Sequence, residues 1–178
     1  PYKVFNLGGV RVAVMGLTTE DTRKMAHPDN QKNIEFRDAI AEAAKLVPEL
    51  RRQADVVIAA THMGHYENGN HGTQAPGDVE MARAVNGLNL VVGGHTQNPA
   101  CMKAENVLER AYVPGAECRP DLQNGSWIVQ AHEWGKYVGR ADFEFRNGEF
   151  KLVRYVLIPV NLKKTVRTAD GKSSKVPY

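Results

Sequence analysis

The sequence predicts a mixed α/β fold, and two observations support this prediction. In the first 92 residues, apolar runs of strand length alternate with amphipathic segments of helix length. The order strand–helix–strand–helix–strand is typical of a parallel sheet with right-handed crossovers. In the later part of the chain, runs with alternating apolar and polar residues follow one another without a helical pattern between them. We therefore expect a βαβαβ unit followed by an antiparallel meander.

The first expected strand and helix occupy the first 50 residues. Val10 to Leu17 is apolar on both faces, as in a buried strand, and residues 18–21 have the composition of a loop with helix-capping residues. From Phe36 to Leu50 the apolar residues follow the i, i+3, i+4, i+7 spacing of an amphipathic helix. Asp38 is in place to cap its start, and Pro48 predicts a kink or an early end.

Two further strands and a short helix follow. The apolar run 55–60 predicts a second buried strand, and a polar stretch rich in glycine and asparagine occupies 67–77. Asp78 is expected to cap a short helix over 79–85, and Leu88 to Val92 is the third strand. Asp78 and Glu80 could be interpreted as an acid/base pair. A helix cap and a first-turn carboxylate explain them more simply.

The meander is predicted from three alternating runs, 126–131, 137–145 and 150–158. Asn147-Gly148, between the last two runs, is a strong hairpin signal. The polar segment 161–178 contains a turn-like Thr-Ala-Asp-Gly sequence at 168–171 and is interpreted as an exit segment.

Two histidines stand where predicted buried strands end. His62 follows the run 55–60, and His95 follows the run 88–92, in a Gly-Gly-His-Thr-Gln sequence. The carboxyl ends of strands in open α/β sheets face the functional crevice, and two imidazoles on one rim suit a divalent metal. Gln97 can add an amide oxygen. A single histidine at a strand end is more often a hydrogen-bonded structural residue, so the argument depends on the pair.

Composition limits the function classes. The chain has 178 residues, of which 42% are hydrophobic and 24% charged, with a net charge of +3. No apolar run approaches the roughly 20 residues that cross a bilayer, so we expect no membrane partner. No basic stripe with interleaved aromatic residues is present, so we expect no nucleic acid polymer as partner. Because the chain starts at Pro1 without a signal-like segment, we expect the native protein to begin earlier.

Cys101 and Cys118 bracket a polar loop and are not in a Cys-x-x-Cys arrangement. A disulfide between them would stabilise the fold by about 3 kcal/mol and would imply an oxidising compartment. From composition alone, two unrelated buried thiols fit equally well.

Several strings of the sequence resemble one known family, and they run through nearly the whole chain. The resemblance is to the calcineurin-like metallophosphatase domain of the bacterial periplasmic 5′-nucleotidase/UDP-sugar hydrolase family. The strings that carry it lie at 14–19, 59–66, 75–84, 93–97, 130–140 and 157–162.

The resemblance implies a fold and a site. The fold would be a four-layer αββα sandwich holding two divalent cations, for which neutral nitrogen and oxygen ligands suit Zn²⁺, Mn²⁺ or Co²⁺ alike. His62 and His95 would bind one metal ion, and Gln97 the other. The family hydrolyses nucleoside monophosphates and UDP-sugars in the periplasm. Its closest members have a disulfide after the Gly-Gly-His-x-Gln string, which favours pairing of Cys101 with Cys118.

Two other histidines are candidates to lie just outside the metal ligands. His65 follows His62 by three residues and is a candidate to lie near the phosphate. His132 precedes a glycine-containing turn after a predicted strand and is a candidate to approach the crevice from the meander. For each of them, an ordinary loop histidine is the alternative.

The sequence also departs from the family. The Asp-x-His and Gly-Asn-His-Glu/Asp strings, which supply a bridging carboxylate and the catalytic histidine–aspartate pair, are missing. We therefore interpret residues 1–160 as the second half of the catalytic domain, with no catalytic acid of its own. Residues 161–178 would lead toward a nucleotide-binding domain.

Three hypotheses follow. The first is a phosphoesterase whose other half lies outside this chain, which is then inactive alone. The second is a non-catalytic half-domain or binding module that self-associates through an exposed apolar sheet face. The third is a self-contained one-metal hydrolase, which is the weakest because the site has no carboxylate.

Overall fold

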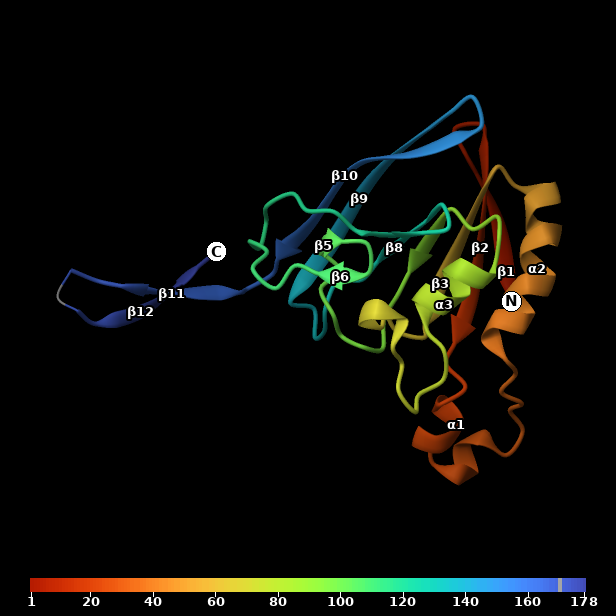
Figure 1. Ribbon diagram of the computed structural model, residues 1–178, viewed down its shortest axis with the longest axis horizontal. Coiled ribbons are helices and arrows are strands. Elements are labelled where there is room, and N and C mark those ends of the chain that lie inside the picture. Colours follow the sequence, from red (N-terminus) through yellow and green to blue (C-terminus); the bar gives the residue numbers. More distant parts are fainter. Residues whose placement is uncertain (170) are drawn as a thin grey trace.

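The computed structural model describes residues 1–169 and 171–178. Its centre is a six-stranded sheet, and most of the strands can be followed in Figure 1. The strand order is β1-β2-β3-β4-β8-β7. The bounds of these strands are β1 Tyr2–Leu7, β2 Val10–Thr18, β3 Val56–His62, β4 Leu90–Val92, β7 Asp121–Gln123 and β8 Ser126–Val129. The mixed α/β class predicted from the sequence is confirmed.

The four inner strands of this sheet are parallel, and the two outer strands are antiparallel to their neighbours. β2, β3, β4 and β8 pair in parallel, whereas β1 pairs with β2 and β7 with β8 in the antiparallel sense. The prediction that 126–131 starts a meander was wrong, because β8 joins the parallel layer beside β4. Three of its four residues are buried and the other is half-buried, so both faces are covered, and the sequence pattern did not distinguish a parallel strand from the start of a meander.

The main helix, α2, spans Ala39–Gln53. The Asp38 side chain accepts a hydrogen bond from the backbone N–H of Ala41 at 2.8 Å, which confirms the predicted cap. Pro48 does not end the helix, which continues for five more residues. The buried Val47 and Leu50 anchor that last part against the sheet, and their packing outweighs the lost backbone hydrogen bond.

The other helical segments are short. They are α1 Thr22–Met25, the 3-10 turns Pro28–Gln31 and Glu67–Gly69, and α3 Asp78–Ala84. The predicted cap role of Asp78 was wrong. Gly77 is the cap residue of α3, and its backbone N–H donates to the Glu80 side chain at 3.0 Å.

Alternating residues of the parallel strands divide the core into two clusters. Ala13, Val57, Val91 and Ile128 face α2 and α3 and are fully buried. Ile58, Leu90, Trp127 and Val129 point to the opposite face, where they pack against residues of β9 and β10. The helices therefore cover one face of the sheet, and a hairpin covers part of the other (Figure 1).

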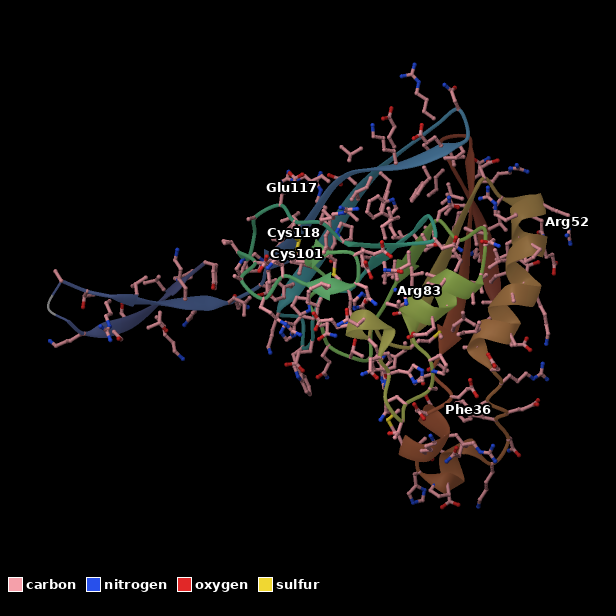
Figure 2. The ribbon with its side chains drawn as sticks, in the orientation of Figure 1. Phe36, Arg52, Arg83, Cys101, Glu117 and Cys118 are labelled. Carbon is pink, nitrogen blue, oxygen red and sulfur yellow. A yellow bond between two sulfur atoms is a disulfide. The ribbon has the colours of Figure 1, made fainter. Side chains whose placement is uncertain are left out.

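Three small antiparallel sheets complete the fold. β9 (Tyr137–Arg146) and β10 (Glu149–Pro159) form the hairpin that the Asn147-Gly148 signal predicted. β5 (Met102–Ala104) and β6 (Val107–Leu108) pair within the loop that Cys101 and Cys118 close with a disulfide, visible in Figure 2. This disulfide confirms the pairing that the family resemblance favoured.

The last hairpin consists of β11 (Lys163–Arg167) and β12 (Ser173–Pro177) and projects from the body (Figure 1). The sequence indicated only an exit segment with a turn at 168–171. In that turn Gly171 N–H donates to the Thr168 carbonyl at 2.9 Å, and Asp170 lies outside the described residues. None of the described helices is both long and apolar enough to cross a membrane.

Candidate metal centre

Three histidines follow neighbouring parallel strands at one edge of the sheet. His62 ends β3, His95 lies three residues after β4, and His132 lies three residues after β8. Because these strands are parallel and adjacent, their carboxyl ends share an edge, which is where α/β sheets place functional residues. His62 and His95 therefore lie together at the carboxyl edge of the sheet, as the sequence predicted.

The structure brings His62 and His95 together. Their ring centroids are 5.1 Å apart, and the rings meet edge to face at 66°. The turn after β4 can approach His62 because it starts with glycine. A Cβ atom on Gly94 would lie 3.2 Å from His62 Nδ1, which is tighter than most such contacts. Gly94 thus allows the close approach of the two imidazoles.

The backbone around His95 is unusual. His95 has φ +75° and Gln97 has φ +59°, in the left-handed region that non-glycine residues rarely adopt. Residues held there cost of order 1–3 kcal/mol each and cluster at functional sites. The Gln97 side chain is exposed at the same turn as His95, so it is free to reach a ligand at this edge.

The electrostatic environment favours neutral His95. Partial burial lowers the pKa of His95, and the nearby His62 lowers it further, while Asp21 acts in the opposite direction. A metal-binding imidazole must be deprotonated, so this environment suits a ligand.

Asp21 also lies at this edge, which the sequence did not predict. It follows β2 and is buried, and its carboxylate accepts hydrogen bonds from Lys24 Nζ and from the backbone N–H of Ala75. These bonds, that of Lys24 first, lower the pKa of Asp21 and keep it charged beside His95. The sequence suggested only a capping role at this loop, and Asp21 makes no side-chain cap bond. Its place after a parallel strand was the signal for an edge residue.

Asp78 is buried between the two histidine-bearing turns. Its Oδ1 accepts from Thr61 Oγ1 at 2.6 Å, and a Cβ atom on Gly93 would lie 2.4 Å from its Oδ2. Burial raises the pKa of Asp78 to about 6, against the opposing hydrogen bond from Thr61. The buried Oδ2 has no hydrogen-bond partner among the described residues. Asp78 therefore contacts both Thr61, next to His62, and Gly93, in the turn before His95, from the buried side.

His65 lies in the interior and not on the open edge. Its side chain is fully buried, and its Nε2 lies 2.8 Å from Asp121 Oδ2. Burial alone would raise the pKa of Asp121, but hydrogen bonds from His65 and from the backbone of Asn106 bring it below its ordinary value. Asp121 was not a sequence candidate, because 56 residues separate it from His65.

His132 lies beside the His95 turn. Its backbone N–H donates to the Asn98 carbonyl at 3.3 Å, and its ring stacks on Tyr137 with 5.8 Å between centroids. Its Nδ1 accepts from the backbone N–H of Glu133 at 2.8 Å. Burial lowers the pKa of His132, and Lys136 lowers it further.

The metal ligands predicted from the sequence at this edge are the imidazoles of His62 and His95 and the amide oxygen of Gln97. Across the residues that the structure describes, no group of three or more His, Cys, Asp or Glu side chains is arranged to hold a metal ion. His62 and His95 fit part of a metal site by ligand type and by the proximity of their rings, and Gln97 fits by ligand type and by its place in the left-handed turn that also carries His95. A complete site would need ligands from another segment.

Comparison with known families matches residues 3–99 to the calcineurin-like phosphoesterases. The chain belongs to this family. The matched calcineurin-like phosphoesterase segment covers the parallel layer through β4 and includes His62, His95 and Gln97.

Relatives that are similar over the whole chain are much longer than it. Protein UshA of Escherichia coli (strain K12) is 59% identical over an alignment of 182 positions. This alignment covers 100% of this chain and 33% of UshA. A 5′-nucleotidase of Vibrio parahaemolyticus is 56% identical over 99% of this chain and 32% of its own length. The chain is thus homologous to UshA and to 5′-nucleotidases, and it spans about a third of the length of these relatives.

A solved structure agrees with this chain in fold. A putative 5′-nucleotidase from Staphylococcus aureus superposes with a TM-score of 0.66 at 21% identity. It covers 96% of this chain, and the chain covers 31% of it. This likeness supports the mixed α/β arrangement described above.

Proposed function

We propose that this chain is the half of a two-metal phosphoesterase domain that supplies His62, His95 and Gln97 to the metal ions. The observation that carries the proposal is the 5.1 Å separation of the His62 and His95 rings at the carboxyl edge of the sheet. The left-handed conformation of His95 and Gln97 supports it, because such strain persists where function requires it. By resemblance to the family, His62 and His95 would share one ion and Gln97 would bind the other.

The role of these residues is to hold and orient the ions. Zn²⁺, Mn²⁺ and Co²⁺ all suit imidazole and amide ligands. Two such ions, when bound, polarise phosphoryl oxygens and stabilise the charge of an in-line displacement. A neutral donor set binds them weakly, so carboxylate ligands from the other half are needed, and the isolated chain is inactive.

The substrates we propose for the whole protein are nucleoside 5′-monophosphates and UDP-sugars. Relatives named 5′-nucleotidase and UshA, with 56% and 59% identity, support this proposal. The disulfide Cys101–Cys118 suits the oxidising periplasm, where we place the protein. Residues 1–160 would complete a four-layer αββα sandwich with the other half, and 161–178 would lead to a nucleotide-binding domain.

The test is phosphate release from UMP and UDP-glucose with added Mn²⁺ or Zn²⁺. We expect none from the 178-residue chain alone. We expect release when the part of Escherichia coli UshA that carries the missing ligand strings is added in trans. A His62→Ala/His95→Ala double variant should abolish that release, whereas a His27→Ala/His71→Ala variant should retain it. Release that survives the first double variant would overturn the proposal.

A second candidate function is a self-associating, non-catalytic half-domain. A hollow of 560 Å³ opens between the sheet and the β9–β10 hairpin and is lined by apolar side chains that include Leu7, Ile58, Val92, Phe143 and Phe145. Val92 is 44% exposed there. An exposed apolar surface of this kind promotes association.

Sedimentation velocity separates the two candidates. If the chain is a free-standing module, it forms a dimer that a Val92→Glu substitution disrupts. If it is half of an enzyme domain, dimerisation is weak and the added UshA segment displaces it. A monomer that binds no hydrophobic dye would exclude the second candidate.

A further inference from the structure

His65 and Asp121 form a fully buried pair that joins two distant parts of the chain. Both side chains are 0% exposed, and His65 Nε2 lies 2.8 Å from Asp121 Oδ2. Asp121 is itself fixed, because its Oδ1 accepts from the backbone N–H groups of Asn106 and Leu122. The carboxylate can only accept hydrogen bonds, so His65 donates from Nε2, and Asp121 selects that form of the ring.

The backbone of His65 is tied to the turn that carries His95 and Gln97. Its N–H donates to Thr96 Oγ1 at 3.1 Å, and its carbonyl accepts from Asn98 Nδ2 at 2.9 Å. Thr96 and Asn98 flank Gln97 on both sides. The two bonds therefore clamp the turn after β3 to the turn after β4.

Gly64 also lies in the contact between the turn after β3 and the turn after β4. It has φ +99°, and a Cβ atom there would lie 2.6 Å from Thr96 Cγ2 and 3.4 Å from His95 Cδ2. The backbone next to His65 thus lies directly against the His95 ring. A displacement of His65 would move Gly64 against His95 and would change the relation of His95 to His62.

We propose that His65 and Asp121 are a positioning pair for the candidate metal centre. The pair fixes the ring of His65, and through Thr96 and Asn98 it holds the His95–Gln97 turn at its distance from His62. This role rests on the proposed function for its purpose, but the geometry it sets can be measured without metal. The alternative is a buried hydrogen bond that only stabilises the fold.

The test compares Asp121→Asn with Ser126→Ala in the metal-free chain. Asparagine keeps the acceptor for the backbone N–H groups but presents an N–H group to His65, which forces the ring to carry its proton on Nδ1. Ser126 is a matched control. It is fully buried, donates one hydrogen bond to the Leu88 carbonyl at 2.9 Å, and lies at the opposite end of its strand from the site.

Two NMR signals are read. Imidazole ¹⁵N shifts should show the change of tautomer of His65 in Asp121→Asn. The nuclear Overhauser contact between the His62 and His95 rings should be strong in the unaltered chain and in Ser126→Ala, and weak or lost in Asp121→Asn. A Thr96→Val variant, which removes one clamp and leaves the buried pair intact, should weaken the same contact.

A contact between the two rings that is unchanged in both Asp121→Asn and Thr96→Val would overturn the proposal. So would its absence from the unaltered chain. Zn²⁺ titration then separates this proposal from the proposed function. If Zn²⁺ binds, Asp121→Asn should weaken it by about 10-fold or more, as the loss of a supporting partner does at other metal sites. If no Zn²⁺ binds even when the UshA segment with the missing ligand strings is added, but the ring contact responds, the proposed function fails and the positioning pair stands.

Discussion

The core beneath the helices and the turns at the carboxyl edge of the sheet are built on opposite principles. Beneath α2 and α3, small and branched apolar residues such as Ala43, Val47, Leu50 and Val91 are fully buried, with regular backbone on every side. At the edge, His95 and Gln97 adopt left-handed backbone, and in the interior next to these turns the buried polar atoms His65 Nδ1 and Asp78 Oδ2 have no hydrogen-bond partner among the described residues.

Stability and function therefore depend on different parts of the molecule. The core lowers the free energy of the fold by removing apolar surface from water, at about 25 cal/mol per Å². At and next to the edge, left-handed backbone and unpartnered polar atoms lower the stability of the fold, and the same turns hold two imidazoles edge to face. Changes in the core should therefore lower stability without altering the contact between the two imidazoles, and changes that remove a buried charge or backbone strain at the edge should raise stability.

The largest expected effect is in the core. Leu50→Ala should lower the free energy of unfolding by about 2–5 kcal/mol, because it removes buried methyl groups and leaves a cavity. Urea denaturation measures this loss, and the exposed Lys45→Ala is the control. The His62–His95 ring contact should persist in the folded fraction. Loss of that contact in Leu50→Ala would break the separation between core and edge.

The disulfide comes next. Cys101 and Cys118 are 17 residues apart, so a Cys101→Ser/Cys118→Ser variant should lose about 3 kcal/mol, mostly by freeing the unfolded chain. The same urea measurement applies, with dithiothreitol on the unaltered chain as a second route to the reduced form. Equal midpoints with and without the disulfide would contradict this expectation.

Asp78 should destabilise the fold increasingly as the pH rises from about 4 through 6. Its pKa is about 6 in the folded chain against an ordinary value of 3.8, so the folded state holds the proton more tightly. The contribution of Asp78 to stability is therefore complete below about pH 4 and is lost as pH rises to 6 and beyond. Asp78→Asn should raise stability at pH 7 by about 2–3 kcal/mol and should flatten this pH dependence. A variant that is less stable at pH 7 than the unaltered chain would show that the carboxylate is well solvated.

The smallest effect concerns strain at His95. Because glycine adopts φ +75° freely, His95→Gly should be more stable than His95→Ala by about 1 kcal/mol. At the exposed helical residue Lys45, the order should reverse, with glycine about 1 kcal/mol worse than alanine. Thermal unfolding of the four variants checks both signs. The same order at both positions would mean that His95 is not strained.

The regular elements could be predicted because their residues satisfy local rules. Asp38 caps α2, Asn147-Gly148 forms the β9–β10 turn, and the apolar runs before His62 and His95 become the buried strands β3 and β4. The juxtaposition of His62 and His95 followed from the same logic, since parallel neighbours end at one edge.

The rest depends on contacts between distant segments. β8 pairs with β4 because its buried face fits the sheet, and no short-range signal separates that from a meander. The Asp121–His65 bond spans 56 residues, and Asp78 is drawn from a cap position into the interior by Thr61. Local sequence shows that such residues are polar, but it does not show which distant partner offsets the free-energy cost of burying them.

The most direct test of the central claim is calorimetric titration of the 178-residue chain with Zn²⁺. We expect weak binding to the unaltered chain and to His27→Ala/His71→Ala, because only neutral donors hold the ion there, and at least a tenfold further loss of affinity in His62→Ala/His95→Ala. Equal binding by both double variants, or no binding by the unaltered chain, would contradict the claim that His62 and His95 form part of a metal centre.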